Sequence, residues 1–236
     1  MHAEHIIGLT AKEKSGDPAA IASAVAARFA TIQADGALRP YCAERPLGAH
    51  GNSFELDHLA GDSGYVFLSV GERYRRYAEN GTAFGFIFDA EQLVLGCGAL
   101  VGPDMLHHYE DLMEQCIAEV AATLPPLPMI SEEELAGFAA LAGDDPAMLA
   151  YVREQSVYRD SDIDMAIRCG DMDEPGAAEA VALFKQRAPA LQAQWRKSGT
   201  EALAILEEGM EVLVKGSLPL TMAINTIEGG YANNPD

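Results

Sequence analysis

The sequence predicts an α+β fold in which a small mixed core is interrupted by a helical section. The apolar patterns read in order as strand, helix, long loop, two strands, a block of helices and a final strand, without the regular alternation of a doubly wound sheet. The 236 residues, 49% of them hydrophobic, are enough to bury a core without disulfide or metal staples. We therefore expect one domain over 1–236, with the mixed core at 1–103 and 209–228 and a helical insertion at 104–208.

The first elements of this core are a strand and an amphipathic helix. Residues 5–10 (HIIGLT) have the pattern of a short buried strand. Asp17 suits a helix N-cap, Pro18 suits the first helical position, and Gly36 supplies a stop. Apolar side chains recur between them at helical spacing, on one face: Ile21, Val25, Phe29 and Ile32.

The middle of the core begins with a long loop and continues with strands. Residues 37–63 are rich in Gly, Pro, Asn and His and read as an irregular loop with a turn of helix near 56–59. Residues 65–69 (YVFLS) and 84–89 (FGFIFD) have the apolar, β-favouring composition of strands. Two shorter elements are also expected, a helix over 71–79 and a strand within 93–100.

The section that follows has helical character. Residues 104–122 form one candidate helix, and Ser131 with Glu134 is a capping box that opens a second. Asp145-Pro146 opens a third, and one or two more follow Pro175.

The C-terminal part returns to β structure. Residues 211–214 (EVLV) read as a strand, and we expect the structured part of the chain to continue over 216–227. Trp195 is expected to anchor a core, because no basic cluster surrounds it as in a base-stacking platform. The tail, 229–236, is expected to be loose.

Charge is the unusual feature of the composition. The chain carries 36 acidic and 16 basic side chains, a formal net charge of −20. Such a surface repels phosphate backbones and anionic membranes, so we expect neither nucleic acid nor membrane partners. The surplus serves solubility or attracts a basic protein, and the sequence leaves both open.

Compartment and targeting follow from local patterns. No apolar run of 18 residues exists to span a bilayer, and the N-terminus lacks the basic and apolar regions of a signal peptide. No two of the four cysteines form a CxxC pair, which favours reduced thiols and a cytoplasmic location; they are Cys42, Cys97, Cys116 and Cys169.

Common nucleotide and hydrolase motifs are missing. The chain has no GxGxxG, GxxxxGK[ST], GxSxG or HExxH. The segment Asp160–Asp171 places acids at positions 1, 3, 5 and 12 of a calcium loop, but Met165 stands where the sharp turn requires glycine. A solvated acidic turn between helices is the alternative, and we expect no metal cofactor.

A metal-assisted hydrolase is a third, weaker hypothesis. It would use Asp104, Glu110 and the consecutive pair His107-His108. Consecutive side chains on a helix point in different directions, so the two histidines do not easily share one ion.

Three segments carry more information together than any motif alone. The first joins residues 5–10 to the end of the first helix, 31–40 (TIQADGALRP). The second runs from 64–69 (GYVFLS) through the arginine-bearing turn to 84–89, and the third is 211–220 (EVLVKGSLPL).

This layout resembles the ADP-ribosyltransferase-like superfamily, and the three segments cover about a third of the chain. In that superfamily the first strand carries a His or Arg, a helix ends in an I…DG.L.P pattern, a GYVFLS-like strand supplies the second motif, and a late EVLV.G.(I/L)PL strand carries a catalytic Glu. The resemblance implies a small split β-sheet sandwich with NAD, used as a substrate, in a cleft between two sheets.

The resemblance also implies roles for seven residues. Glu211 would bond the nicotinamide ribose and stabilise an oxocarbenium-like state, and Ser69 would support the site. His5 or Arg45 would hold the adenosine ribose or a phosphate. Thr10, in the first motif, would help to bind NAD, and Tyr65 or Phe67 would pack on the nicotinamide.

One hypothesis is therefore an enzyme that cleaves NAD or transfers its ADP-ribosyl group to a protein or small-molecule acceptor. Gly209 stands two residues before Glu211, where protein-modifying members have Gln or Glu, which argues against an arginine-specific modifier. The alternative is a non-catalytic acidic protein whose helical section recognises a basic partner.

Overall fold

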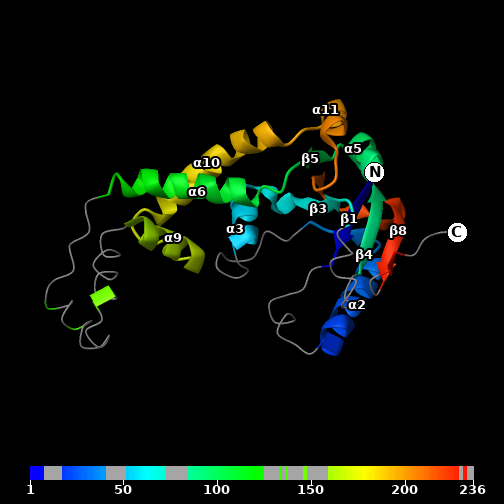
Figure 1. Cartoon of the computed structure of the whole chain (residues 1–236), viewed down its shortest axis with the longest axis horizontal. Coiled ribbons are helices and arrows are strands. Elements are labelled where there is room, and N and C mark those ends of the chain that lie inside the picture. The colour runs from blue at the N-terminus through cyan, green and yellow to red at the C-terminus, as the bar shows by residue number, and fades with distance from the viewer. Residues whose placement is uncertain are drawn as a thin grey trace. The chain divides into compact units, whose positions relative to one another are not determined.

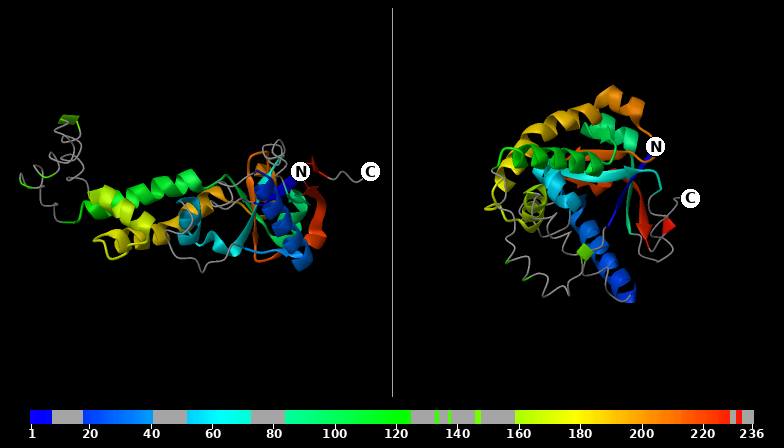
Figure 2. Two further views of the ribbon diagram at one scale, coloured as in Figure 1. Left: turned by 90° about the horizontal axis from the view of Figure 1, so that it is seen from below. Right: turned by 60° about the vertical axis from the view of Figure 1, so that its left-hand side comes forward.

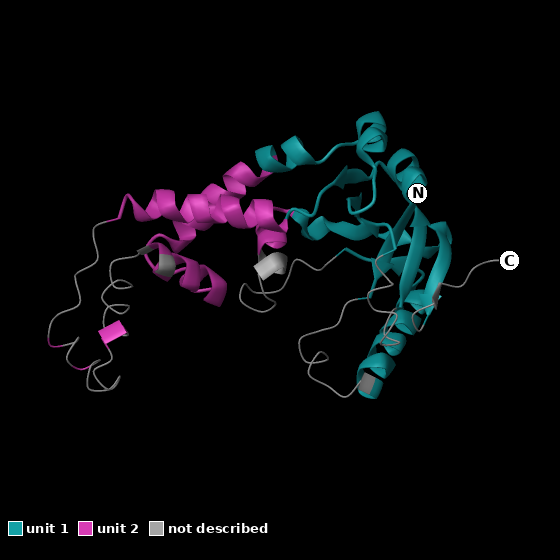
Figure 3. Ribbon diagram, in the orientation of Figure 1, with its two compact units in different colours: residues 1–43, 62–105, 190–236 teal, residues 44–61, 106–189 magenta. Residues whose placement is uncertain are grey.

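The described part of the chain divides into two compact units (Figure 3). A computed structural model describes residues 1–7, 18–40, 52–72, 84–124, 133, 137, 146–147, 159–228 and 231–232. Unit 1 comprises 1–43, 62–105 and 190–236, and unit 2 comprises 44–61 and 106–189. Residues 190–208, which the sequence analysis places in the helical insertion, lie in unit 1.

Unit 1 contains an antiparallel sheet with helices, so the predicted mixed α/β class is confirmed (Figure 1). The order in the seven-stranded sheet is β5-β6-β3-β1-β4-β8-β9, and β2 pairs with β7 in a small second sheet. The strands are β1 (His2–Ile6), β2 (Ala37–Leu38), β3 (Tyr65–Val70), β4 (Gly85–Asp89), β5 (Leu100–Gly102), β6 (Glu211–Lys215), β7 (Leu218–Pro219), β8 (Ala223–Glu228) and β9 (Tyr231–Ala232).

One face of the large sheet forms the core of unit 1. Ala3 pairs with Val70 on one side and with Phe88 on the other, and all three side chains are buried. Helix α2 (Pro18–Asp35) packs on this face, where Phe29 stacks on Phe86 with ring centroids 4.9 Å apart (Figures 1 and 2). Burial of each aromatic side chain contributes about 2 kcal/mol, so the contact of α2 with this face stabilises the unit.

Helix α2 is the predicted amphipathic helix. Val25 and Phe29 are buried, while Ile21 and Ile32 pack against the same core. Gly36 ends the helix with φ +74°, a backbone conformation that glycine adopts without strain.

The prediction of a strand within 93–100 is wrong for most of that segment. Residues Ala90–Cys97 form helix α5, and β5 starts only at Leu100. Asp89 caps the helix by accepting hydrogen bonds from the backbone N–H groups of Glu91 and Gln92, and Gly98 closes it with φ +64°. These two caps outweigh the β-favouring composition of the segment.

Unit 2 is built from helices. The described ones are α3 (Asn52–Leu59), α6 (Leu106–Ala121), α9 (Arg159–Cys169) and the larger part of α10 (Ala177–Trp195). Tyr109 of α6 meets Phe184 of α10 edge-on at 5.9 Å. A Cβ atom at Gly176 would lie 2.9 Å from the Ile163 side chain, so the turn before α10 requires glycine for close packing.

Several expectations for these regions are corrected. Asp160, Asp162 and Asp164 lie within α9, so the segment is neither a calcium loop nor a turn between helices. Trp195 is 38% exposed and does not anchor the core, while the next residue, Arg196, is buried. Tyr231–Ala232 pairs with β8, so this part of the expected loose tail is a strand.

Other expectations fall outside the described residues. These are the last three residues of the first predicted strand, most of the helix expected over 71–79, the capping box at Ser131 and Glu134, and the N-cap at Asp145. Among the described residues, no helix combines the length and the apolarity required to cross a membrane. The three cysteines that are described, Cys97, Cys116 and Cys169, are free thiols.

Candidate functional site

The three segments singled out in the sequence meet in unit 1. The strands that carry them, β1, β3 and β6, are consecutive in the sheet in the order β6-β3-β1. The two ends of this group, β1 and β6, are separated by about two hundred residues in the chain, so only the tertiary fold places their side chains within reach of one another.

The remaining parts of the segments also pair. Ala37 lies opposite Pro219 and Leu38 opposite Leu218, which joins the end of the first segment to the Gly-Ser-Leu-Pro-Leu part of the third. The Leu220 N–H donates to the Gly36 carbonyl at 2.9 Å. Leu38 and Leu218 are both fully buried, so apolar contact reinforces the short ladder.

Ser69 and Glu211 are neighbours in the sheet. Ser69 of β3 lies directly opposite Glu211 of β6 and, on its other side, opposite Glu4 of β1. Residues directly opposite one another in an antiparallel sheet project to the same face. Glu4, Ser69 and Glu211 therefore form a row on the face that does not pack on α2, with the two carboxylate-bearing residues about 10 Å apart at their Cα atoms.

Glu4 is a member of this row that the sequence analysis missed. Its side chain is buried although it carries a carboxylate. The available signal was an acidic residue, Glu4, between Ala3 and His5, shortly before the apolar pair Ile6-Ile7. The strand pairing that sets Glu4 beside Ser69 is not readable from the sequence.

His5 lies at the seam between β1 and β3 and not in the row. It follows Glu4, so its side chain leaves the strand on the opposite face. The pairing of β1 with β3 ends at Glu4, and the His5 Nδ1–H then donates to the Phe67 carbonyl at 2.9 Å. The imidazole N–H thus bonds the Phe67 carbonyl in place of a backbone N–H of β1.

Burial sets the charge of His5. It lowers the pKa of the imidazole from its usual value of 6.5, and the hydrogen bond to the Phe67 carbonyl opposes this only in part. The ring is therefore neutral at pH 7, with Nδ1 protonated and Nε2 left as an acceptor. A neutral ring suits a ribose hydroxyl better than a phosphate.

The other predicted residues are placed as follows. Tyr65 and Phe67 precede Ser69 in β3 by four and two residues, so all three side chains project to the same face of the sheet. Tyr65 and Phe67 are both half-buried. Phe67 lies opposite Leu213 and Tyr65 opposite Lys215. Thr10 and Arg45 lie outside the described residues.

A glycine turn sets the start of β6. The Gly209 N–H donates to the Val70 carbonyl, and the Val70 N–H donates to the Met210 carbonyl at 2.8 Å. Gly209 has φ +93°, which other residues rarely adopt. The position two before Glu211 thus requires glycine to direct the chain into the strand that carries the glutamate.

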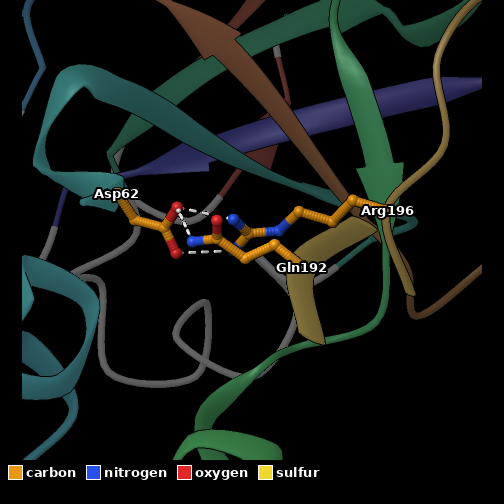
Figure 4. A network of polar contacts seen from close by, with 3 residues as sticks. All are labelled: Asp62, Gln192 and Arg196. Carbon is orange, nitrogen blue, oxygen red and sulfur yellow. Dashed lines mark hydrogen bonds and ion pairs between the residues drawn. The ribbon is translucent and has the colours of Figure 1, made fainter. Parts of the chain in front are cut away.

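A buried ion pair closes the end of β3 away from Ser69 (Figure 4). Arg196 Nη1 and Nη2 donate to the two carboxylate oxygens of Asp62 at 2.5 and 2.8 Å, and Gln192 Nε2 donates to Asp62 Oδ1 at 3.0 Å. Asp62 belongs to the 3₁₀ turn η1 (Asp62–Gly64), which leads directly into Tyr65. No local pattern in the sequence indicates this network, because its members are about 130 residues apart.

Arg196 approaches the sheet beside Gly102. A Cβ atom at Gly102 would lie 3.0 Å from Arg196 Cγ and 3.1 Å from the Trp195 carbonyl oxygen. Gly102 is opposite Glu211, so this Cβ would point to the face that carries the Ser69–Glu211 pair. Arg196 thus covers this face at the β5 edge, where Val101 and Lys197 exchange two backbone hydrogen bonds.

Metal ligation finds no support among the described residues, where no group of three or more His, Cys, Asp or Glu side chains is arranged to hold an ion. His107 Nδ1 lies 3.2 Å from Glu110 Oε2 in the first turn of α6, an exposed contact within one helix.

The Glu4–Ser69–Glu211 row can stabilise positive charge. Two carboxylates on either side of a hydroxyl favour a cation or a transition state in which positive charge develops. Such a state forms when a glycosidic bond breaks to give an oxocarbenium-like sugar.

Comparisons of the chain with protein-family models, with curated proteins and with solved structures find no match.

Proposed function

We propose that the protein binds NAD and breaks its nicotinamide–ribose bond, passing the ADP-ribosyl group to a protein, a small molecule or water. The observation that carries the proposal is the adjacency of β1, β3 and β6, the strands of the three motifs that resemble the ADP-ribosyltransferase-like superfamily. The register of Ser69 with Glu211 adds support, because that resemblance requires both residues at one site.

In this proposal Glu211 carries the chemistry. Its carboxylate accepts a hydrogen bond from the nicotinamide ribose and stabilises the positive charge that develops on the sugar as nicotinamide leaves. Ser69 lies opposite Glu211 and orients the glutamate or the ribose. Glu4, on the far side of Ser69, adds negative potential to the same face.

The aromatic side chains of β3 would bind the cofactor. His5 leaves β1 on the opposite face of the sheet, so it would support the site indirectly, through the hydrogen bond of Nδ1 to the Phe67 carbonyl that holds β1 beside β3. Tyr65 or Phe67 would pack on nicotinamide from the Ser69 face. Arg45 remains the proposed partner of a phosphate.

Release of nicotinamide from NAD tests this proposal. Purified protein is incubated with NAD labelled in the nicotinamide ring, alone and with candidate protein acceptors, and free nicotinamide is measured by chromatography. We expect Glu211→Gln to lower the rate about a hundredfold or more, as when a preorganised electrostatic contact in a transition state is removed. Ser69→Ala is expected to have a smaller effect.

Glu201→Gln is the matched control. Glu201 is an exposed glutamate of unit 1 on α11 (Gly199–Ile205), and its substitution makes the same charge change outside the row. It should leave the rate unchanged. The proposal is wrong if the parent protein releases no nicotinamide above background with any acceptor, or if Glu211→Gln and Glu201→Gln behave alike.

A further inference from the structure

Unit 2 contains a cavity that the proposed NAD chemistry does not use. It measures about 240 Å³ and lies among α3, α6 and α9. All of its lining residues belong to unit 2, so its shape depends on that unit alone.

The lining of this cavity is divided by chemistry. Leu59, Met113 and Ile167 supply apolar surface, and each is buried. Glu110 and Glu114 come from α6, four residues apart and hence one turn apart on the same side of the helix. Asp164 and Arg168 come from α9.

The carboxylates of the cavity are not balanced by cations within its lining. Arg168 Nε donates to Asp164 Oδ2 at 2.6 Å, so this pair largely neutralises itself. Arg168 is the only basic side chain among the described lining residues, so Glu110 and Glu114 add two further carboxylates to the lining; Glu110 Oε2 also lies 3.2 Å from His107 Nδ1, outside the lining. The cavity therefore has an apolar wall and a net negative charge, in a protein whose formal charge is already −20.

Size and charge together select the occupant. Pockets for whole small-molecule ligands usually measure about 300–1,000 Å³, so this one suits a smaller group. A metal ion is disfavoured, because no ligating cluster is present among the described residues. An arginine or lysine side chain matches, since its hydrocarbon stem packs on apolar surface while its charged head remains near carboxylates.

We propose that this cavity receives an arginine or lysine side chain from a basic segment of a partner protein. The stem lies on Met113 and Ile167, and the head lies between Glu110 and Glu114. The net charge of the protein increases the rate of encounter with such a segment, and the cavity gives the encounter a defined anchor.

The methyl group of Met113 is the reporter for the test. The full chain is labelled with ¹³C at its methionine methyl groups, and the Met113 signal is assigned with the variant Met113→Leu. Two probes are titrated: an acetylated and amidated Gly-Gly-Arg-Gly-Gly peptide and n-butylguanidinium chloride. We expect both to shift the Met113 signal saturably, and the neutral alcohol 1-pentanol to have no such effect.

Charge variants locate the binding. Glu110→Gln/Glu114→Gln should raise the Kd of the peptide about tenfold, while Asp111→Asn/Glu179→Gln should change it less than about twofold. The control makes the same charge change at exposed residues of the same unit that do not line the cavity. Circular dichroism confirms that each variant retains its helices.

A second pair of variants should tighten binding. Arg168→Gln removes the competing cation and exposes Asp164 to the incoming side chain, so we expect the Kd to fall about threefold. Arg39→Gln, which disrupts the exposed Asp35–Arg39 pair of unit 1 at the same helical spacing, should leave the Kd unchanged. A gain in affinity cannot result from unfolding.

The outcomes discriminate between occupants. If both carboxylate double variants weaken binding equally, the attraction is diffuse charge and the cavity proposal is overturned. If n-butylguanidinium binds and the peptide does not, the cavity is a small-molecule site and the partner proposal is wrong. Loss of NAD activity in Glu211→Gln has no bearing on any of these results.

Discussion

Units 1 and 2 each contain an arginine that makes two hydrogen bonds to a carboxylate far away in the sequence. In unit 1, Arg196 contacts Asp62, and the side chains are 3% and 2% exposed. In unit 2, Arg187 Nη2 contacts both carboxylate oxygens of Glu119, at 3.1 and 2.8 Å, and the side chains are 39% and 55% exposed. The two contacts are chemically alike, and burial is the main difference.

This difference decides what each contact contributes. Water already solvates both partners of the exposed pair, so loss of the contact changes little. In the buried pair, removal of either partner leaves a charge in a medium that solvates it poorly. Asp62 also begins the turn into β3, so the buried pair fixes a strand of the candidate site, whereas the exposed pair joins only α6 to α10.

The largest effect is expected from Arg196→Met. The substitution leaves the Asp62 carboxylate buried without its guanidinium, which costs about 3–5 kcal/mol in free energy of unfolding. Trp195 is the only tryptophan of the chain, so urea unfolding followed by its fluorescence reports on this part of unit 1. The variant Asp62→Leu/Arg196→Met, which removes both charges, should recover much of the loss. Equal stability of Arg196→Met and the parent protein would contradict the importance of burial.

A pH-dependent effect is expected from His5. Its pKa is lowered by burial, so the unfolded chain binds a proton more readily than the folded protein. The stability that depends on neutral His5 is complete above pH 6.5 and is lost progressively as the pH falls below 6.5 toward the lowered pKa. Thermal unfolding of the parent and of His5→Gln between pH 5 and pH 8 measures it. The parent should lose more stability than the variant over this interval, and parallel curves would exclude His5 as the source.

The smallest effect is expected from Glu119→Gln. We expect no resolvable change in the urea midpoint, whether it is followed by circular dichroism of the helices or by Trp195 fluorescence. The substitution removes the carboxylate that Arg187 contacts. A double-mutant cycle with Arg187→Met therefore measures the free energy of the Arg187–Glu119 interaction directly. A loss as large as that of Arg196→Met would remove the distinction between the two units.

Local patterns predicted the elements of unit 1 better than the contacts between them. Helix α2 and strands β3, β4 and β6 follow from apolar spacing, and Gly36 marks the end of α2 as expected. The region after Asp89 was misread, because Leu93, Val94 and Leu95 favour a strand by composition while Asp89 and Gly98 cap a helix. The expectation that Trp195 anchors a core was wrong: its side chain is 38% exposed, and the neighbouring Arg196 is buried because its contact with Asp62 is made across the fold.

The sequence by itself determined the mixed class, the main strands, the acidic charge and the three segments that suggest NAD chemistry. These properties depend on residues close together in the chain, or on composition alone. Only the tertiary structure decided that Glu4 stands beside Ser69, that His5 leaves the sheet on the opposite face, and that Asp62 is bonded to Arg196. Each depends on strand register or on a contact across more than sixty residues, and register is set by how whole faces pack together.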